Sequence, residues 1–479
     1  MVEEEPFSNE TNGNGEIHNE NNSSNSFKEL DPELEKKLCD LWDITVEKDV
    51  CTCLDEYNAM QIFEGFMRKF DGIYPRAIEI LIGILANMTM MSSKTGLKLS
   101  ENNSLLHYLL FNVLCQMNDV QTMIQVMRLF TTFLTDWNEC SDNQEEGIME
   151  AESQNENSQR KLIKAKFLNY FKSELISPND ASPNWQALVE KFFFILEQSL
   201  NATLLDSTIS YLFNLLDNDD QILDFFAGNS RLVDAICMAS LTRLRLDNAD
   251  KSFIASQYSQ TNQDALQTPI VARAADGQPS VPYRSQFSQD DILTTDHIFN
   301  KFFLCLQTLS TCELGAASLL ASCDCVFQLY DEYLERCLST FNDWEIKSSH
   351  SLKSSVGQES IQNLLCVLSV LNCIFPDRCQ AESQLRQLHL KYPKFFQKFF
   401  TLCNYYLNLF NELVNKSKKR TSPSTSAVEQ EDASNMNNFK LAQTFMKDLF
   451  ANLEELKQDN DSNLNRIFVN CSRLLNEQI

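Results

Sequence analysis

The residues best suited to chemistry form a stripe along one segment. In the run RAIEILIGILANM, residues 76–88, a carboxylate (Glu79), a glycine (Gly83) and a carboxamide (Asn87) follow one another at intervals of four. That spacing places all three on one face of a helix, while apolar residues form another face. A glycine inside a helix costs about 1 kcal/mol. We therefore expect close approach by a neighbouring helix, or by the backbone of a ligand, to offset that cost.

The same order of residue types recurs in a second segment. In LDSTISYLFNLLD, an acid (Asp206), a small residue (Ser210) and an asparagine (Asn214) again stand four positions apart. The difference between positions 214 and 87 is 127, close to three units of about 42 residues, within the length range of HEAT and armadillo repeats. We therefore interpret both segments as corresponding helices of repeated units.

Cysteine pairs are the other candidates for chemistry. Cys51 with Cys53, and Cys323 with Cys325, form C-x-C pairs, but neither pair has the second pair or nearby histidine of a zinc site. Most of the 16 cysteines lie in apolar helical runs, where they behave as small buried hydrophobes. No phosphate loop, dinucleotide fingerprint or nucleophile elbow is present. We expect no metal, no cofactor and no enzymatic activity; the alternative is a helical enzyme without a linear signature.

The charge balance narrows the class of partners. The 479 residues carry a formal net charge of −26. A nucleic-acid-binding surface needs a basic face that displaces phosphate counterions, so we expect neither a nucleic-acid partner nor an anionic membrane surface. Acidic surfaces suit basic protein segments, or simply keep a large protein in solution. The N-terminus lacks an apolar signal region and no apolar run spans a bilayer, so we expect an intracellular chain with reduced thiols.

Helical periodicity runs through most of the chain. Only 11 glycines and 11 prolines occur, too few for a chain rich in turns, and long segments repeat apolar residues at helical spacing almost without a strand signal. The sequence predicts an all-α protein whose first helix begins at Asp31-Pro32. We expect a disordered acidic tail at 1–28 and one helical repeat domain at 29–479. Three insertions interrupt that domain: an acidic one at 140–160, a flexible one at 250–290, and a basic then polar one at 416–438.

Shorter helices accompany the two striped helices. The segment LDEYNAMQIFEGFMRKF, before residue 76, indicates a short helix, a turn and another helix. After residue 214, Gly228-Asn229 separates a short helix from a longer one. A unit of this size cannot bury its apolar faces alone, so neighbouring units must stack and share a continuous core.

Two family resemblances follow from these segments. The sequences GILANM and YLFNLL resemble the third helix of armadillo repeats, including its asparagine. The stretch over about residues 29–90 resembles the serum amyloid A-like protein family, and weaker likeness extends near 184–236. That resemblance implies an armadillo-type fold, no enzymatic activity, and a nuclear or intracellular protein linked to cell proliferation. The residues that carry it are Cys39, Trp42, Asp43, Asp49, Val50, Asn58, Ala59, Ile62 and Phe63.

The armadillo resemblance gives the stripes a role. In that family the third-helix asparagines line a concave groove and hold the main chain of an extended segment, because a carboxamide offers both a donor and an acceptor to a peptide unit. It implies that Asn87 and Asn214 do so here, while Glu79 and Asp206 select basic residues. The alternative is that these asparagines bridge neighbouring helices of the chain itself. Trp42 can similarly extend a groove, but we favour its packing the first helix onto the array.

We therefore predict an armadillo/HEAT-like right-handed superhelical solenoid with disordered insertions, of roughly six to eight units. Its expected function is that of a non-catalytic scaffold or adaptor for protein segments, with a preference for basic ones. A regulator or transport factor that binds through its convex face or its insertions is the alternative. A basic cluster is either a nuclear-import signal or the basic end of a helix: Lys416, Lys418, Lys419 and Arg420.

Overall fold

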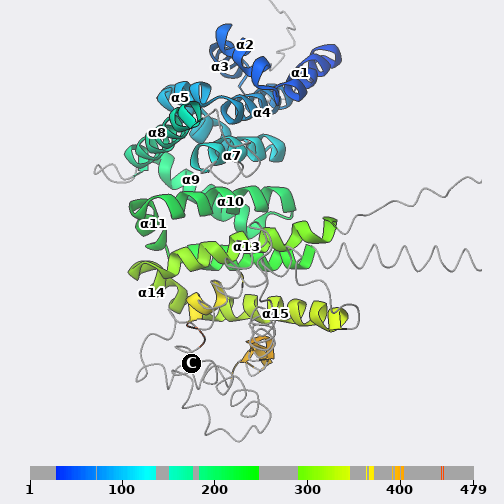
Figure 1. Cartoon of the computed structure of the whole chain (residues 1–479), viewed down its shortest axis with the longest axis vertical. Helices are drawn as coiled ribbons and strands as arrows, with labels where there is room; N and C mark the ends of the chain where they lie inside the picture. The colour runs from blue at the N-terminus through cyan, green and yellow to red at the C-terminus, as the bar shows by residue number, and fades with distance from the viewer. Residues whose placement is uncertain are drawn as a thin grey trace, which may run out of the picture.

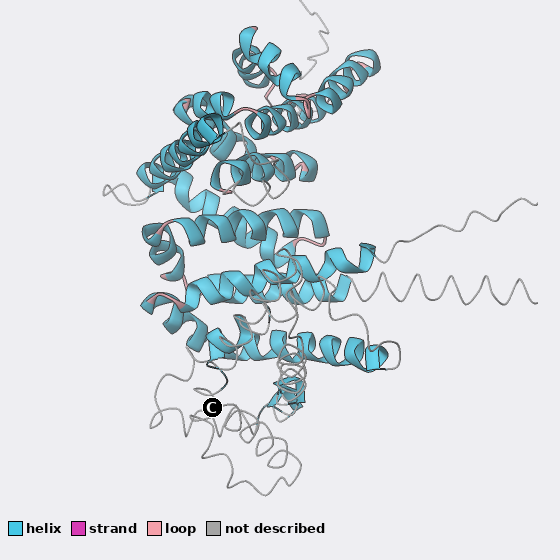
Figure 2. Cartoon of the chain, viewed as in Figure 1, coloured by secondary structure: helices cyan, strands magenta, loops and turns pink. Residues whose placement is uncertain are grey.

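The computed structural model describes most of the chain up to residue 345 and scattered positions beyond it. Within the residues described, every regular element is a helix (Figure 2). The all-α prediction is confirmed for this part of the chain. The residues described are 28–71, 73–135, 150–175, 183–246, 290–345, 363, 366–371, 391, 394–396, 398–399, 401–403, 444 and 446.

The first helix begins where the sequence predicts. Helix α1 spans Pro32–Ile44, and the Asp31 carboxylate accepts hydrogen bonds from the backbone N–H groups of Glu33 and Leu34. Asp31 is thus the N-cap and Pro32 occupies the first turn, where its missing N–H costs nothing. The predicted start of α1 is confirmed.

A short helical hairpin follows α1. Helix α2 (Lys48–Glu56) and helix α3 (Ala59–Lys69) are joined by Asn58, which has a φ of 53°. Asparagine tolerates this left-handed conformation better than most residues, because its short polar side chain fits the turn. The predicted sequence of short helix, turn and helix is confirmed, and Asn58 is one of the residues that carry the family resemblance.

A row of long helices forms the centre of the molecule. Helix α4 (Pro75–Met91) packs against α7 (Val120–Leu134), α7 packs against α10 (Ala202–Asn218), and α10 packs against α13 (Asp290–Ser310) (Figure 1). Helix α1 covers the outer side of α4. The two striped segments are therefore α4 and α10, separated in the row by α7.

The remaining helices flank this row. Helices α8 and α9 follow α7, and α11 with the helix at 231–246 follows α10, with residues 228–230 between them as predicted. The helices of this outer group are α5 (Ser93–Glu101), α6 (Asn103–His107), the π-helix η1 (Tyr108–Leu114), α8 (Glu150–Leu175), α9 (Pro183–Gln198), α11 (Asp220–Ala227), α14 (Glu313–Ala321) and α15 (Cys323–Glu345).

One continuous core joins these elements. Buried apolar side chains form a single cluster that includes residues of α2, every helix of the row and α15. Tyr211 of α10 lies between Phe130 of α7 and Phe192 of α9, with ring centroids 5.8 and 5.9 Å away. Because each long helix buries side chains against its neighbours, the packed helices stabilise one another.

The structure changes one predicted boundary. Helix α8 begins at Glu150, so residues 150–160 of the predicted acidic insertion at 140–160 are helical. The physical reason is tertiary: Arg160 donates hydrogen bonds to the backbone carbonyls of Thr89 and Met90, at the end of α4. Most of the tail, residues 140–149, residues 250–289 and the whole segment 416–438 lie outside the described residues.

A helix that crosses a bilayer must be long and almost wholly apolar. No single helix among them is long and apolar enough to cross a membrane. The pair Asn300–Ser310 and Glu313–Ala321, bent by 117° at its break, meets the criterion by length and composition together.

Candidate functional site

The glycine of the α4 stripe lies beneath an indole ring. A Cβ built on Gly83 would overlap the Cε2 and Cζ2 atoms of Trp42, the partly buried tryptophan of α1. The close approach that the sequence requires at Gly83 is therefore made by a neighbouring helix. Trp42 packs α1 onto α4, as predicted.

Asn87 uses both ends of its carboxamide inside the protein. It is 2% exposed. Its Nδ2 donates to the Thr45 hydroxyl at 3.0 Å and to the Trp42 carbonyl at 3.3 Å, both at the end of α1. Its Oδ1 accepts a hydrogen bond from the Arg128 guanidinium of α7. Asn87 thus bridges α1 and α7, which is the alternative role that the sequence left open for it.

Glu79 is also committed to a partner of the same chain. Its carboxylate is 2.7 Å from the guanidinium of Arg76, which also pairs with Glu35 of α1 at 2.8 Å. Burial raises the pKa of the Glu79 carboxyl above its usual range, and the ion pair with Arg76 opposes that rise. Glu79 therefore helps to hold α1 on α4.

The second stripe, on α10, is more open. The Asp206 carboxylate is 3.3 Å from Arg243, on the helix at 231–246. The Ser210 hydroxyl donates to the Asp206 carbonyl at 2.6 Å and accepts from Lys301 of α13 at 2.8 Å. Asn214 donates to the Ser210 carbonyl of its own helix at 2.8 Å. Asn87 and Asn214 therefore have different partners, although they lie on helices of the same row.

A cleft of about 390 Å³ is lined by residues from all four helices of the row. Helix α4 contributes Met90, and α13 contributes Lys301; the other walls come from α7 and α10 between them. Of the four stripe residues predicted to bind a partner, Asp206 lines this cleft, and Asn87 reaches it through Arg128. The complete lining is Met90, Arg128, Thr131, Thr132, Thr135, Thr203, Asp206, Ser207, Ser210 and Lys301.

Two of the lining residues are cations that pair with no carboxylate among the described residues. Arg128 donates to the amide oxygens of Asn87 and Gln125, and Lys301 donates to the Ser210 hydroxyl. In the described part of the chain, neither cation forms a salt bridge. Burial lowers the pKa of both, and for Lys301 the nearby Asp206 carboxylate opposes that shift.

Sequence reasoning missed these two cations. The signal was present, because Arg128 and Lys301 are the charged residues inside the otherwise uncharged runs VQTMIQVMRLFTTFL and IFNKFFLCL. A charge in a buried helix requires a polar surrounding or a partner. These two residues face one cleft because of how the helices stack, and no local sequence pattern reveals that stacking.

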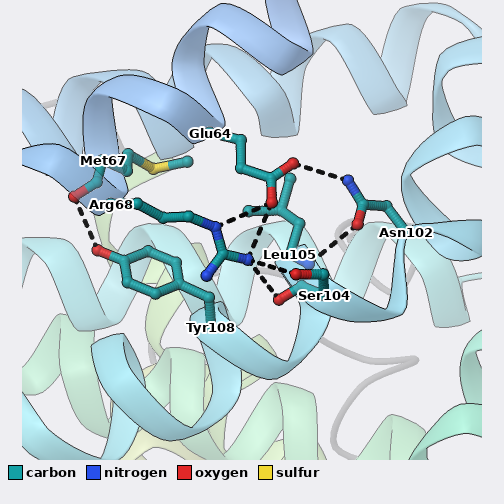
Figure 3. A network of polar contacts seen from close by, with 7 residues as sticks. All are labelled: Glu64, Met67, Arg68, Asn102, Ser104, Leu105 and Tyr108. Atoms are coloured by element: carbon teal, nitrogen blue, oxygen red, sulfur yellow. Dashed lines mark hydrogen bonds and ion pairs between the residues drawn. The ribbon is translucent and has the colours of Figure 1, made fainter.

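A second polar network lies near the N-terminal end of the row (Figure 3). Arg68 of α3 donates to Glu64 at 2.9 Å and to the hydroxyl and carbonyl of Ser104, both at 2.8 Å. Asn102, the N-cap of α6, donates to Glu64 at 2.9 Å, and Tyr108 donates to the Met67 carbonyl at 3.1 Å. The donors and acceptors of this network satisfy one another and attach α3 to α6 and η1, so we assign the network a structural role.

The cysteine pairs do not form a metal centre in the described residues, where no group of three potential ligands occurs. Cys51 is buried and donates to the Thr45 carbonyl, while Cys53 is exposed. Burial raises the pKa of the Cys51 thiol. The predicted import signal, Lys416, Lys418, Lys419 and Arg420, lies outside the described residues.

Comparison with known proteins finds relatives for part of the sequence. Protein saal1 of Danio rerio is 38% identical over 112 residues, which are 23% of this chain and 23% of that protein. Protein SAAL1 of Homo sapiens is 36% identical over 107 residues, 22% of each chain. Part of this chain is similar to SAAL1 proteins.

The similarity to SAAL1 spans less than a quarter of the length of these relatives. No protein-family model matches the chain, and no solved structure matches it. The resemblance to serum amyloid A-like proteins is thus supported as a partial likeness to SAAL1.

Proposed function

We propose that the chain is a non-catalytic scaffold that binds a segment of a partner protein in the cleft across α4, α7, α10 and α13. The observation that carries the proposal is the cleft itself, which is built from four successive helices of one row. Such a surface offers an extended segment contacts with several units in turn. We propose that this row belongs to a right-handed superhelical solenoid of armadillo/HEAT type.

The chemistry of the lining supports binding over catalysis. The residues that line the cleft include hydroxyls, two cations and one carboxylate, and among them there is no histidine or cysteine. The carboxylate, Asp206, is paired with Arg243. A serine nucleophile must pass its proton to a general base. Lys301 lies 2.8 Å from the Ser210 hydroxyl, but that hydroxyl donates to the Asp206 carbonyl and not to the amine. Hydroxyl groups with fixed positions can, by contrast, fix the orientation of a bound ligand.

A bulky residue at the mouth of the cleft tests the proposal. Thr135 is exposed, lines the cleft, and donates its hydroxyl to the carbonyl of Thr131. Thr52 on α2 is also exposed and donates to the carbonyl four residues earlier, so it is a matched control. Proximity labelling with the full chain identifies the proteins that lie near it in the cell. We expect some of these proteins to be lost from the labelled set with Thr135→Trp and all of them to be retained with Thr52→Trp.

The alternative makes the opposite prediction. If partners bind through the convex face or the insertions, both tryptophan variants will label the same proteins as the unmodified chain. That result would abandon the cleft as the binding surface.

By resemblance we also propose a nuclear or cytoplasmic location and a link to cell proliferation. The basic cluster supports the nuclear part, because clustered lysines and arginines are read by import receptors. Replacing Lys418, Lys419 and Arg420 with alanine in a fluorescent fusion tests it. Loss of nuclear signal supports import through this cluster, and an unchanged distribution rejects it.

A further inference from the structure

We infer that the cleft binds an anionic group, a carboxylate or a phosphate, carried by an extended segment of the partner protein and held between Arg128 and Lys301. This inference rests on the proposed function and adds the chemistry of the partner. It also reverses the expected preference for basic segments. That preference depended on Glu79 and Asp206, and each of these carboxylates is already paired with an arginine of the chain.

Arg128 has hydrogen-bond capacity to spare. A guanidinium carries five N–H donors, and the bonds that Arg128 makes with described residues go to the neutral amides of Asn87 and Gln125. Neutral acceptors satisfy donors without cancelling charge. The positive charge of Arg128 therefore remains available to an oxyanion, for which a guanidinium is the preferred partner.

Lys301 supplies a second cation from the other side of the cleft. Its Nζ donates to the Ser210 hydroxyl, which is likewise neutral. Asp206 lies in the same cleft, but its carboxylate pairs with Arg243. Among the described residues that line the cleft, two are cations and one is a carboxylate, and that carboxylate pairs with an arginine outside the lining, in a chain whose net charge is −26. A local excess of the opposite sign to that of the molecule indicates a binding surface rather than general solvation.

The remaining lining groups suit an oxyanion. Thr131, Thr203 and Ser207 offer hydroxyl groups, each of which can donate to a carboxylate or phosphate oxygen. Asn87, which is buried, holds the Arg128 side chain from α4. Asn87 is therefore a positioning residue: it fixes the cation before the ligand arrives, which reduces the entropy lost on binding.

Fluorescence anisotropy with the full chain tests the preference. The probes are labelled nine-residue Gly-Ser peptides whose centre holds three glutamates, one phosphoserine, or three lysines. We expect the glutamate and phosphoserine peptides to bind, more weakly as salt rises, and the lysine peptide to bind at least about tenfold more weakly. The ratio of the two anionic affinities tells carboxylate from phosphate. Equal or tighter binding of the lysine peptide would overturn the inference.

A pair of lysine variants tests the site. Lys301→Gln keeps a donor for Ser210 but removes the charge. We expect this variant to bind the anionic peptides about tenfold more weakly, the usual effect of losing one charge-assisted hydrogen bond. Lys48→Gln, at an exposed position of α2, removes the same charge outside the cleft and should leave affinity unchanged. Equal effects of the two variants would mean that the anionic peptides bind elsewhere, which rejects the inference.

Two further outcomes separate this inference from the proposed function. If no anionic peptide binds but Thr135→Trp still removes labelled neighbours, the scaffold proposal stands and the anionic preference is rejected. If inorganic phosphate displaces the phosphoserine peptide at equal molar concentration, the cleft binds a small anion rather than a segment, which also rejects the inference. Displacement only at a large excess of phosphate supports it.

Discussion

At the scale of single residues, the small size of Gly83 is needed for the contact between α1 and α4. A methyl group there would meet the ring of Trp42, and the indole is held by the surrounding core. We expect Gly83→Ala to destabilise the protein by about 1–3 kcal/mol, because overpacking outweighs the gain in helix propensity. The free energy of unfolding in urea measures this effect.

Gly65 provides the control for that experiment. It lies inside α3, is exposed, and a Cβ built on it meets no atom within 4 Å. Gly65→Ala should stabilise the protein by about 0.5–1 kcal/mol, the ordinary benefit of replacing a helical glycine. A Gly83→Ala variant that gains stability like Gly65→Ala would show that Trp42 does not pack there.

The two stripe asparagines give a second contrast between residues. Removing the Asn87 side chain leaves the buried Thr45 hydroxyl and the half-buried Arg128 guanidinium without this partner, at a cost of about 1–3 kcal/mol. Asn214 is half-buried, and among the described residues its side chain bonds only its own helix. Asn214→Ala should therefore change stability by less than about 0.5 kcal/mol. Thermal unfolding of both alanine variants measures the difference. Equal losses would contradict the unequal roles that the structure gives them.

At the scale of elements, the sequence predicted the helices better than their contacts. Asp31-Pro32 and Asn58 are local signals, and each marks the start of a helix in the structure, α1 and α3 respectively. The α10 stripe is helical as expected, but periodicity does not identify which distant helix lies against it. The start of α8 was missed for the same reason, because its polar first turns are held by contacts that Arg160 makes with α4.

The candidate site was predicted only in part. The stripes marked two helices of the row, and Asp206 does line the cleft. Arg128 and Lys301 escaped because they are far apart in sequence and become neighbours of one cleft only when α7, α10 and α13 stack. The two charged residue types could be read from the sequence, but the proximity of the two side chains could not.

The attachment of α2 to α5 should depend on pH. Asp55 of α2 is bonded by Lys98 and lies 3.1 Å from Lys94, both on α5. Burial alone would raise the pKa of the Asp55 carboxyl, but the hydrogen bonds and charges of the two lysines outweigh it and lower that pKa. The folded protein therefore binds this proton less readily than the unfolded chain does, so the contribution to stability is present above the unfolded pKa of about 4 and is lost as pH falls through the folded pKa.

Melting temperatures measured across that range, on the unmodified chain and on Asp55→Asn, test this linkage. We expect the variant to be less stable at neutral pH and the gap to close as the pH falls below about 4. A gap that stays constant down to the lowest pH would show that Asp55 contributes through shape rather than charge.

At the scale of the whole molecule, the continuous core of the described residues and the cleft extend along the same row of helices. Figure 1 shows that row. A unit that cannot bury its apolar faces alone gains stability only by stacking, and stacking also aligns the polar edges of successive helices into a shared surface. The same packing therefore explains both the continuous core and the gathering of cations within an acidic chain.

The most direct test of the central claim is photo-crosslinking from the cleft. A benzophenone amino acid at position 135, with position 52 as the control, is activated in cells and the attached peptides are sequenced. Our account predicts that position 135 captures a recurring segment rich in glutamate, aspartate or phosphoserine, and that position 52 does not capture it. Capture of that segment at position 52 alone, or of lysine-rich segments at position 135, would contradict the account.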